Sequence, residues 1–350
     1  ADPAKDGYTF KYWSTSTDGE AFDFTSAITE DTTLYAVWEA AQQLAADLVI
    51  NNLDDLKAFA EEVNGGNKYD GKTILLNADI TGMNMVIGLD GTSVKDFKGT
   101  FDGNGHTITV AISGNANQAL FAKNAAGGTI KNLIVAGSVS GTSPVAGICA
   151  QNYGTIESCA NYATISARGS YSGGITGQNN SNGSILNCVN YGAVTTTSTN
   201  NAGGITGNNQ GTMTNCYNVG VITGTKAAGL FNYGNANNVT NCYYLSDGTT
   251  SKGTAKTDAE MKTAEFASTL GDAFKYVDGK YPELTFGKGG GSVTPPADEK
   301  VTVAFMNGTE TYHTVEVEEG ATVTAPATPT KEGYSFKHWS NSENGEAFDF

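Results

Sequence analysis

The residues best able to do chemistry in this sequence are few. Between Gly103 and Ser246 the only acidic residue is Glu157, so Asp102, just before that span, is its one candidate partner for a pair of carboxylates. Glycoside hydrolysis ordinarily needs two carboxyl groups about 5 to 9.5 Å apart. Because no other pair is available there, we predict that the chain is not an enzyme.

Histidines and metal ligands are equally sparse. The three histidines are His106, His313 and His338, and none lies near a cysteine in the sequence. No HExxH segment is present to form a zinc-binding helix. Asp102 and Asn104 in "FDGNGH" offer oxygen atoms, but Ca²⁺ takes six to eight of them, so a tight turn is the expected role of this stretch. We therefore predict no catalytic residue, no cofactor and no metal.

Four of the five cysteines recur at regular intervals. They are separated by 29, 28 and 26 residues, and Leu133 stands at the equivalent place one interval earlier; the four are Cys159, Cys188, Cys216 and Cys242. A cysteine that alternates with leucine behaves as a small apolar core residue. The spacing predicts a stacked ladder of buried free thiols, with disulfides or a metal site as the alternative, although no CxxC pair accompanies them.

These cysteines belong to a repeat that fills the middle of the chain. Its clearest copies are "AGICAQNYGTIESCANYATI" (146–165), "GGITGQNNSNGSILNCVNYGAV" (173–194) and "GGITGNNQGTMTNCYNVGVI" (203–222). A period of 26 to 29 residues holding short strand-like pieces ended by Gly or Asn is typical of a parallel β-solenoid, in which each coil stacks on the next. The predicted fold is mainly β, a right-handed parallel β-helix. Asparagine tolerates left-handed backbone, so we expect a second ladder at a bend of the coils, formed by Asn187, Asn215 and Asn241.

A solenoid must be capped at its ends. Residues 53–63 follow an N-cap Asn52 and place apolar side chains on one helical face, which predicts an N-terminal capping helix. Residues 257–274 show a second helical pattern and are expected to close the far end. The solenoid with its caps should span residues 45–286, followed by a Gly/Pro linker at 287–300.

The two ends of the chain repeat one another. "PAKDGYTFKYWSTSTDGEAFDF" (3–24) aligns without a gap onto "PTKEGYSFKHWSNSENGEAFDF" (329–350). Residues 1–40 would be the C-terminal part, and residues 301–350 the N-terminal part, of one small module with alternating strands. We expect the chain to be cut from a longer array, with each end poorly ordered or completed by the other, within one chain or between neighbouring chains.

Both repeats resemble known families. The pattern "GGITGxNxGxIxNCxNxGxV" resembles the GLUG motif of bacterial surface proteins, which include some immunoglobulin A peptidases and adhesins of gut bacteria. The terminal "GYxFxxW" segments resemble the Listeria-Bacteroides repeat, also called the internalin B-repeat, a β-grasp-like module. The resemblance implies a secreted or wall-anchored bacterial surface protein, an adhesin whose β-helix serves as spacer and binding surface. A carbohydrate-active β-helix, a lyase or hydrolase, is the alternative.

Tyrosines that recur along the coils are the candidate ligand contacts, since tyrosine on a rigid scaffold often binds proteins and stacks on sugars. The residues are Tyr153, Tyr162, Tyr191, Tyr217 and Tyr243. Shielding of the coil corners is their alternative role. The expected partners are a host immunoglobulin, mucin or matrix protein, or a glycan, as the resemblance implies.

Charge and hydropathy exclude other partners. The 350 residues carry a net charge of −16, and a negative surface repels phosphate backbones, so nucleic acid is not expected. No apolar run approaches the roughly 20 residues that span a bilayer, so no direct membrane insertion is expected. We expect the chain to lie outside the cell, on the bacterial surface.

Overall fold

The structure is a computed structural model that describes residues 8–16, 19–24, 32–40, 46–197, 201–246, 251–286, 300–307, 310–318, 326, 328–329 and 336–340. The chain divides into two compact units, residues 1–292 and 293–350. The predicted linker at 287–300 lies outside the described residues, apart from Lys300.

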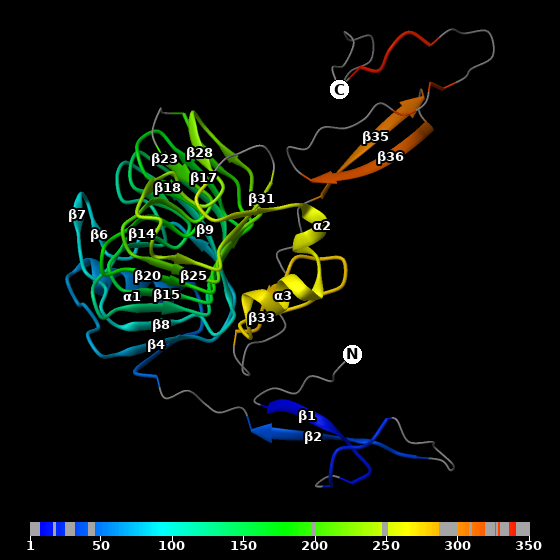
Figure 1. Ribbon diagram of the computed structural model, residues 1–350, viewed down its shortest axis with the longest axis horizontal. Helices are drawn as coiled ribbons and strands as arrows, with labels where there is room; N and C mark the ends of the chain where they lie inside the picture. The colour runs from blue at the N-terminus through cyan, green and yellow to red at the C-terminus, as the bar shows by residue number, and fades with distance from the viewer. Residues whose placement is uncertain are drawn as a thin grey trace. The chain divides into compact units, whose positions relative to one another are not determined.

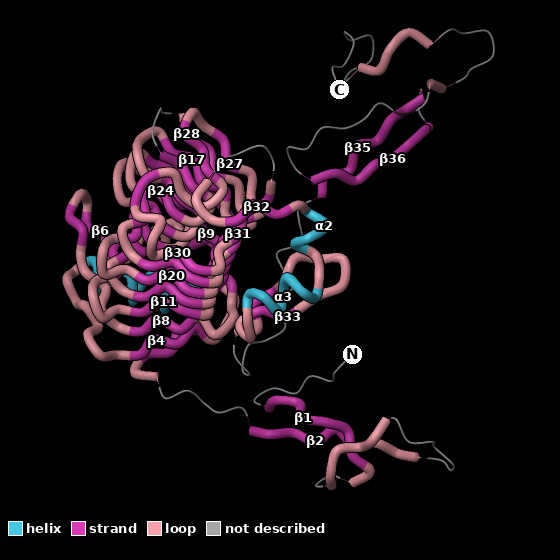
Figure 2. Tube along the Cα trace, in the orientation of Figure 1, coloured by secondary structure: helices cyan, strands magenta, loops and turns pink. Residues whose placement is uncertain are grey.

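The middle of the first unit is a parallel β-solenoid, in which short strands of successive coils stack side by side (Figures 1 and 2). One face is an eight-stranded parallel sheet in the order β3-β4-β8-β11-β15-β20-β25-β30. Equivalent residues of the copies pair directly, as Ile156 does with Ile130 and Ile185. The predicted fold class, mainly β with a parallel β-helix, is therefore confirmed.

The strands of that face are β3 (Leu48–Ile50), β4 (Thr73–Leu76), β8 (Thr100–Asp102), β11 (Thr129–Lys131), β15 (Thr155–Glu157), β20 (Ser184–Leu186), β25 (Thr212–Thr214) and β30 (Val239–Thr240). A five-stranded face holds β10 (Phe121–Asn124), β14 (Cys149–Asn152), β19 (Thr176–Asn179), β24 (Thr206–Asn209) and β29 (Tyr233–Gly234). A four-stranded strip holds β13 (Val145–Ala146), β18 (Ser172–Gly173), β23 (Asn201–Gly203) and β28 (Lys226–Ala228).

The largest sheet branches at β12 (Ile134–Gly141). One branch holds β16 (Ala160–Asn161), β21 (Val189–Asn190), β26 (Tyr217–Asn218), β31 (Tyr243–Leu245) and β32 (Thr254–Lys256). The other branch holds β17 (Thr164–Ala167), β22 (Val194–Thr196) and β27 (Ile222–Thr223). On its opposite edge β12 pairs with β9 (Thr107–Ser113), which pairs with β5 (Ile80–Met83). A short antiparallel hairpin, β6 (Leu89–Asp90) and β7 (Ser93–Val94), projects from the first coils.

The coils turn at a row of left-handed residues. Asn132, Ser158, Asn187, Asn215 and Asn241 all have φ between 51° and 55°. The amide of Asn215 donates to Asn187 Oδ1 at 3.1 Å, and that of Asn241 donates to Asn215 Oδ1 at 2.8 Å. Because asparagine adopts this conformation at low cost, the row bends each coil, and its last three members also tie neighbouring coils together.

Two further asparagine ladders lie inside the solenoid. In the first, each Nδ2 donates to the Oδ1 of the next coil at 2.8 to 2.9 Å, through Asn124, Asn152, Asn179 and Asn209. The second joins Asn161, Asn190 and Asn218 at 2.8 and 2.7 Å. All seven are buried, and their amides also donate to backbone carbonyls at the turns. Apart from Asn124 Oδ1, which has no partner at the end of the first ladder, the ladders thus satisfy one another's buried side-chain amides and several backbone carbonyls.

Small residues allow the coils to stack this closely. Cys159, Cys188, Cys216 and Cys242 are all free and buried. A Cβ placed on Gly192 would lie 2.1 Å from the carbonyl oxygen of Ala163. The glycines of the repeat therefore mark places where backbones of neighbouring coils approach each other.

The helix α1 (Leu53–Asn64) packs on the first coils. Asn52 is its N-cap and accepts from the Asp55 amide, and its buried face carries Leu56, Phe59, Ala60 and Val63. Phe59 packs against Phe97 and Phe101, with ring centroids 5.9 and 5.8 Å apart. These contacts close the apolar interior at this end of the solenoid.

The second predicted cap differs from expectation. Residues 257–274 form two short helices, α2 (Asp258–Met261) and α3 (Ala264–Leu270), and β33 (Phe274–Lys275) then pairs with β34 (Glu283–Leu284). Phe266 of α3 contacts Tyr217 and Tyr243 on the outer face of β26 and β31. The segment therefore covers a flank of the last coils, because the large aromatic side chains there need burial.

The repeated ends form small antiparallel ladders. In the first unit β1 (Tyr8–Ser14) pairs with β2 (Tyr35–Ala40), and in the second β35 (Lys300–Asn307) pairs with β36 (Glu310–Glu318). In the second unit Trp339 packs against Phe305, Tyr312 and Phe336. Completion of one end by the other stays a prediction, since residues 25–31 and 341–350 lie outside the described residues.

Among the described residues, no helix is both long enough and apolar enough to cross a membrane.

Candidate functional site

The two carboxylates singled out in the sequence lie on the eight-stranded face, separated by one strand. Lys131 pairs in register with Asp102 on one side and with Glu157 on the other. Its ammonium group lies 3.2 Å from Asp102 Oδ2, while Asp102 Oδ1 accepts from the Asn104 amide and from Asn132 Nδ2. Asp102 is thus a buried carboxylate that a lysine and a turn already engage.

His106 lies one turn away, on the outer surface of the coils. Its Nδ1 is 3.1 Å from the carboxylate of Asp79, and the same carboxylate accepts from the amide of Thr107. The contact fixes the ring at the start of β9. Neither His106 nor Asp79 belongs to a group of three or more potential metal ligands, and the described residues contain no such group.

The cysteines are buried free thiols. Each thiol of the ladder donates to a carbonyl two residues earlier at 3.2 Å, for example Cys188 to Leu186. Burial raises the pKa of the Cys149 thiol to about 12 and that of Cys159 well above its ordinary value. Since the thiolate is the reactive form, Cys149 and Cys159 are poor nucleophiles.

Three of the predicted tyrosine contacts form a chain beneath the segment that follows α3. The rings of Tyr162 and Tyr191 stack with centroids 4.5 Å apart, and the hydroxyls of Tyr191 and Tyr217 lie 2.7 Å apart. Both of these hydroxyls also bond to the carbonyl of Pro282. Burial raises the pKa of Tyr191 and of Tyr217 well above the ordinary value. Tyr217 is completely buried, so it cannot touch a ligand in this conformation.

The other tyrosines keep some exposure. Tyr243 packs against Phe266 and donates to Asn241 Oδ1 at 2.6 Å. The ammonium group of Lys123 lies 5.1 Å from the ring centre of Tyr153. A ligand contact by Tyr153, Tyr162, Tyr191 or Tyr243 stays a prediction.

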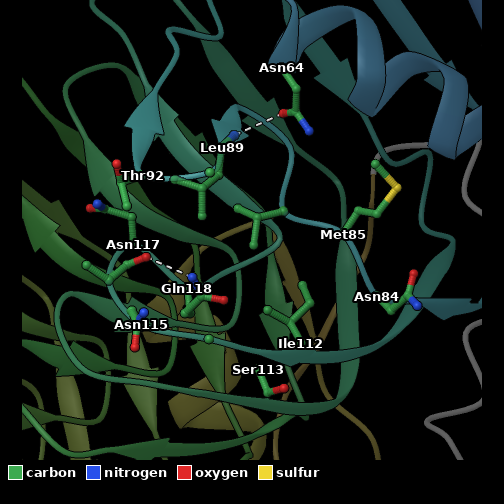
Figure 3. Close-up of a pocket in the computed structure, with 14 residues that line it drawn as sticks. Asn64, Asn84, Met85, Leu89, Thr92, Ile112, Ser113, Asn115, Asn117 and Gln118 are labelled. Carbon is green, nitrogen blue, oxygen red and sulfur yellow. Dashed lines mark hydrogen bonds between the residues drawn. The ribbon is translucent and has the colours of Figure 1, made fainter.

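The first coils contain a pocket that no pattern in the sequence predicts (Figure 3). Its volume is about 440 Å³, and it lies between the end of α1, the β6–β7 hairpin and the end of β9. Its polar wall is formed by Asn64, Asn84, Thr92, Ser113, Asn115, Asn117 and Gln118, and its apolar wall by Met85, Val86, Leu89 and Ile112.

No charged or aromatic side chain lines this pocket, although the chain carries a net charge of −16. Asn64, at the end of α1, holds the start of the β6–β7 hairpin in place, because its Oδ1 accepts from the backbone amides of Gly88 and Leu89 at 2.7 and 2.9 Å. On the other side Gln151 donates to Asn117 Oδ1 at 2.6 Å. A few placed polar groups beside an apolar wall are typical of a binding site, and the neutral lining favours an uncharged ligand.

A solved structure similar to this chain is that of a "putative immunoglobulin A1 protease" from Bacteroides ovatus. The two share 20% sequence identity with a TM-score of 0.49, over 68% of this chain and 92% of that chain. Because that protein is named as a protease, the finding contradicts our prediction that the chain is not an enzyme, and we do not retain that prediction.

The repeated ends match a family model. Residues 1–37 and 301–350 match the Listeria-Bacteroides repeat domain. This part of the predicted resemblance is confirmed: the solenoid stands between two segments of the Listeria-Bacteroides repeat.

Proposed function

We propose that the chain is part of a bacterial surface protein, an adhesin whose β-solenoid presents a binding site for a host extracellular protein or glycan. In this proposal the solenoid coils are GLUG-type repeats and the ends are internalin B-type repeats. The Listeria-Bacteroides repeats on both sides support a place outside the cell. The observation that carries the proposal is the neutral pocket of about 440 Å³ on the first coils.

The pocket has the properties that a recognition site needs. Its walls come from a capped helix and from paired strands, so they are held in place before a ligand arrives. Preorganised walls lower the entropy lost on binding. The tyrosines of the flank are largely used in packing, which makes the pocket the better candidate.

Binding to immobilised immunoglobulin A, mucin and fibronectin tests the proposal. Asn84→Trp should fill the mouth of the pocket, since Asn84 is exposed and lines it, and should weaken binding roughly tenfold or more. Asn237→Trp is the matched control, because Asn237 is also exposed but lies beside β30 in the last coils. Equal binding by both variants would place recognition elsewhere. The adhesin proposal would be refuted if the chain bound none of the three host proteins.

The same samples test catalysis. Immunoglobulin A incubated with the chain is followed by gel electrophoresis and mass spectrometry, because the similar Bacteroides ovatus structure is named as an immunoglobulin A1 protease. A discrete cleavage product would change the proposed role from adhesin to hydrolase. Surface exposure is checked by protease accessibility of the chain on intact source bacteria, and complete protection would refute the proposed location.

A further inference from the structure

The end of β9 is an open sheet edge at the pocket, which Ile112 and Ser113 line. β9 pairs with β12 along its whole length, from Thr107 to Ser113. On the opposite side β5 accompanies it only as far as Val110, which pairs with Met83. After Met83 the chain leaves the sheet, and among the described residues Ala111, Ile112 and Ser113 have no strand on that side.

The direction of the backbone groups along this edge follows from three hydrogen bonds. The carbonyl of His106 accepts from the amide of Ile134, and the amide of Gly114 donates to the carbonyl of Ser140. The backbone amides and carbonyls of the even-numbered residues of β9 therefore point toward β12. The amide of Thr107 instead donates to Asp79 in the first coil, on the opposite side. Backbone groups along a strand alternate in direction with a period of two. The backbone amides and carbonyls of Ala111 and Ser113 therefore point away from β12, toward the space beyond the end of β5.

We propose that this edge binds an extended, uncharged peptide segment of a partner protein by strand addition, in line with β5. This inference rests on the proposed function and names the ligand class of the same pocket. Two amides and two carbonyls in strand register match the hydrogen-bonding pattern of an extended backbone. A sugar has no such regular alternation of donors and acceptors.

The residues that line the pocket determine which side chains the bound peptide should carry. The side chain of Ile112 points inward beside Met85 and Leu89, so every second peptide residue would meet an apolar wall and should be Val, Ile or Thr. The residues between them face Ser113 and the exposed amides of Asn84 and Asn115. Because no charged side chain lines the pocket, a Lys or Asp at the inward position would be buried without a partner.

Selection of a phage-displayed library of short random peptides on the full chain tests this proposal. Ser113→Pro removes the outward amide of Ser113, and proline is tolerated at an edge position whose amide does not bond within the sheet. Ser113→Ala is the matched control, because it removes the hydroxyl and keeps the amide. We expect enriched peptides with an uncharged β-branched centre, which bind the parent chain and Ser113→Ala alike and bind Ser113→Pro roughly tenfold more weakly.

Peptides that bind the parent chain and Ser113→Pro equally would overturn the proposal, as would the absence of any enriched peptide. If Ser113→Pro does not fold, amide hydrogen exchange in the parent chain decides: a selected peptide should slow exchange at Ala111 and Ser113, and unchanged exchange there refutes strand addition. Displacement of the peptides by lactose or another neutral disaccharide would assign the pocket to sugars instead.

The two proposals fail in different ways. A chain that binds mucin or immunoglobulin but selects no peptide retains the proposed function and loses strand addition. A chain that selects peptides dependent on the Ser113 amide but binds none of the host proteins retains the peptide site and loses the adhesin role.

Discussion

Replacement of Asn179 tests whether the buried asparagine ladders hold the coils together. Asn179 accepts from Asn152 Nδ2 at 2.9 Å, and its own amide donates to Asn209 Oδ1 at 2.8 Å and to the Thr212 carbonyl at 3.0 Å. Asn179→Ala removes all three bonds in a region with no exposed surface. At about 1 kcal/mol for each net hydrogen bond, the free energy of unfolding should fall by about 3 kcal/mol.

The neighbouring residue supplies the control. The side chain of half-buried Asn180 makes one long contact, 3.4 Å to the Asn152 carbonyl, so Asn180→Ala should cost about 0.5 kcal/mol or less. Urea denaturation followed by far-UV circular dichroism is the suitable assay, because the three tryptophans, Trp13, Trp38 and Trp339, lie outside the solenoid. Equal destabilisation by the two variants would refute the structural role of the ladder.

Three further predictions concern other parts of the solenoid. The pKa of Tyr191 and of Tyr217 is raised in the folded chain, so their contribution to stability is complete below the unfolded pKa of about 10 and is lost as pH rises above it. The melting temperature should therefore drop above about pH 10, and it should drop less in Tyr217→Phe. Asn52→Ala removes the N-cap of α1 and should lower the free energy of unfolding by about 1 kcal/mol in the same urea assay, whereas Glu61→Ala on the exposed face should not. All five thiols should resist a thiol reagent in the native chain and react in urea; rapid labelling of the native chain would contradict the buried ladder.

The sequence was most informative where the chain repeats. Equivalent residues of stacked coils share one environment, so the spacing of Cys159, Cys188, Cys216 and Cys242 was enough to indicate a solenoid. The same comparison contained the signal for one of the two inner asparagine ladders, since an asparagine also recurs two residues after each of the first three of these cysteines. The need for a bend points only to the asparagine that precedes the cysteine.

The tyrosines show why the contact surface could not be predicted in the same way. A residue that points outward from a coil is exposed only if no other segment covers it. Tyr217 points outward from β26 but is buried by Phe266, Phe274 and the Pro282 carbonyl, which come from a segment outside the repeat. The periodicity gave the direction of the side chain but contained no information about that cover.

The pocket arises from a departure from the repeat. In a regular solenoid each coil supplies partners for the edges of its neighbours, so backbone groups stay open only where a coil is incomplete. Gly82 adopts a φ of +83° within β5, at an irregularity where Met83 follows Thr81 in the pairing with β9. This left-handed conformation suits glycine and helps turn the chain out of the sheet after Met83. The open edge at Ala111 and Ser113 thus accompanies an irregularity of one strand in the first coil, which comparison of the repeat copies does not reveal.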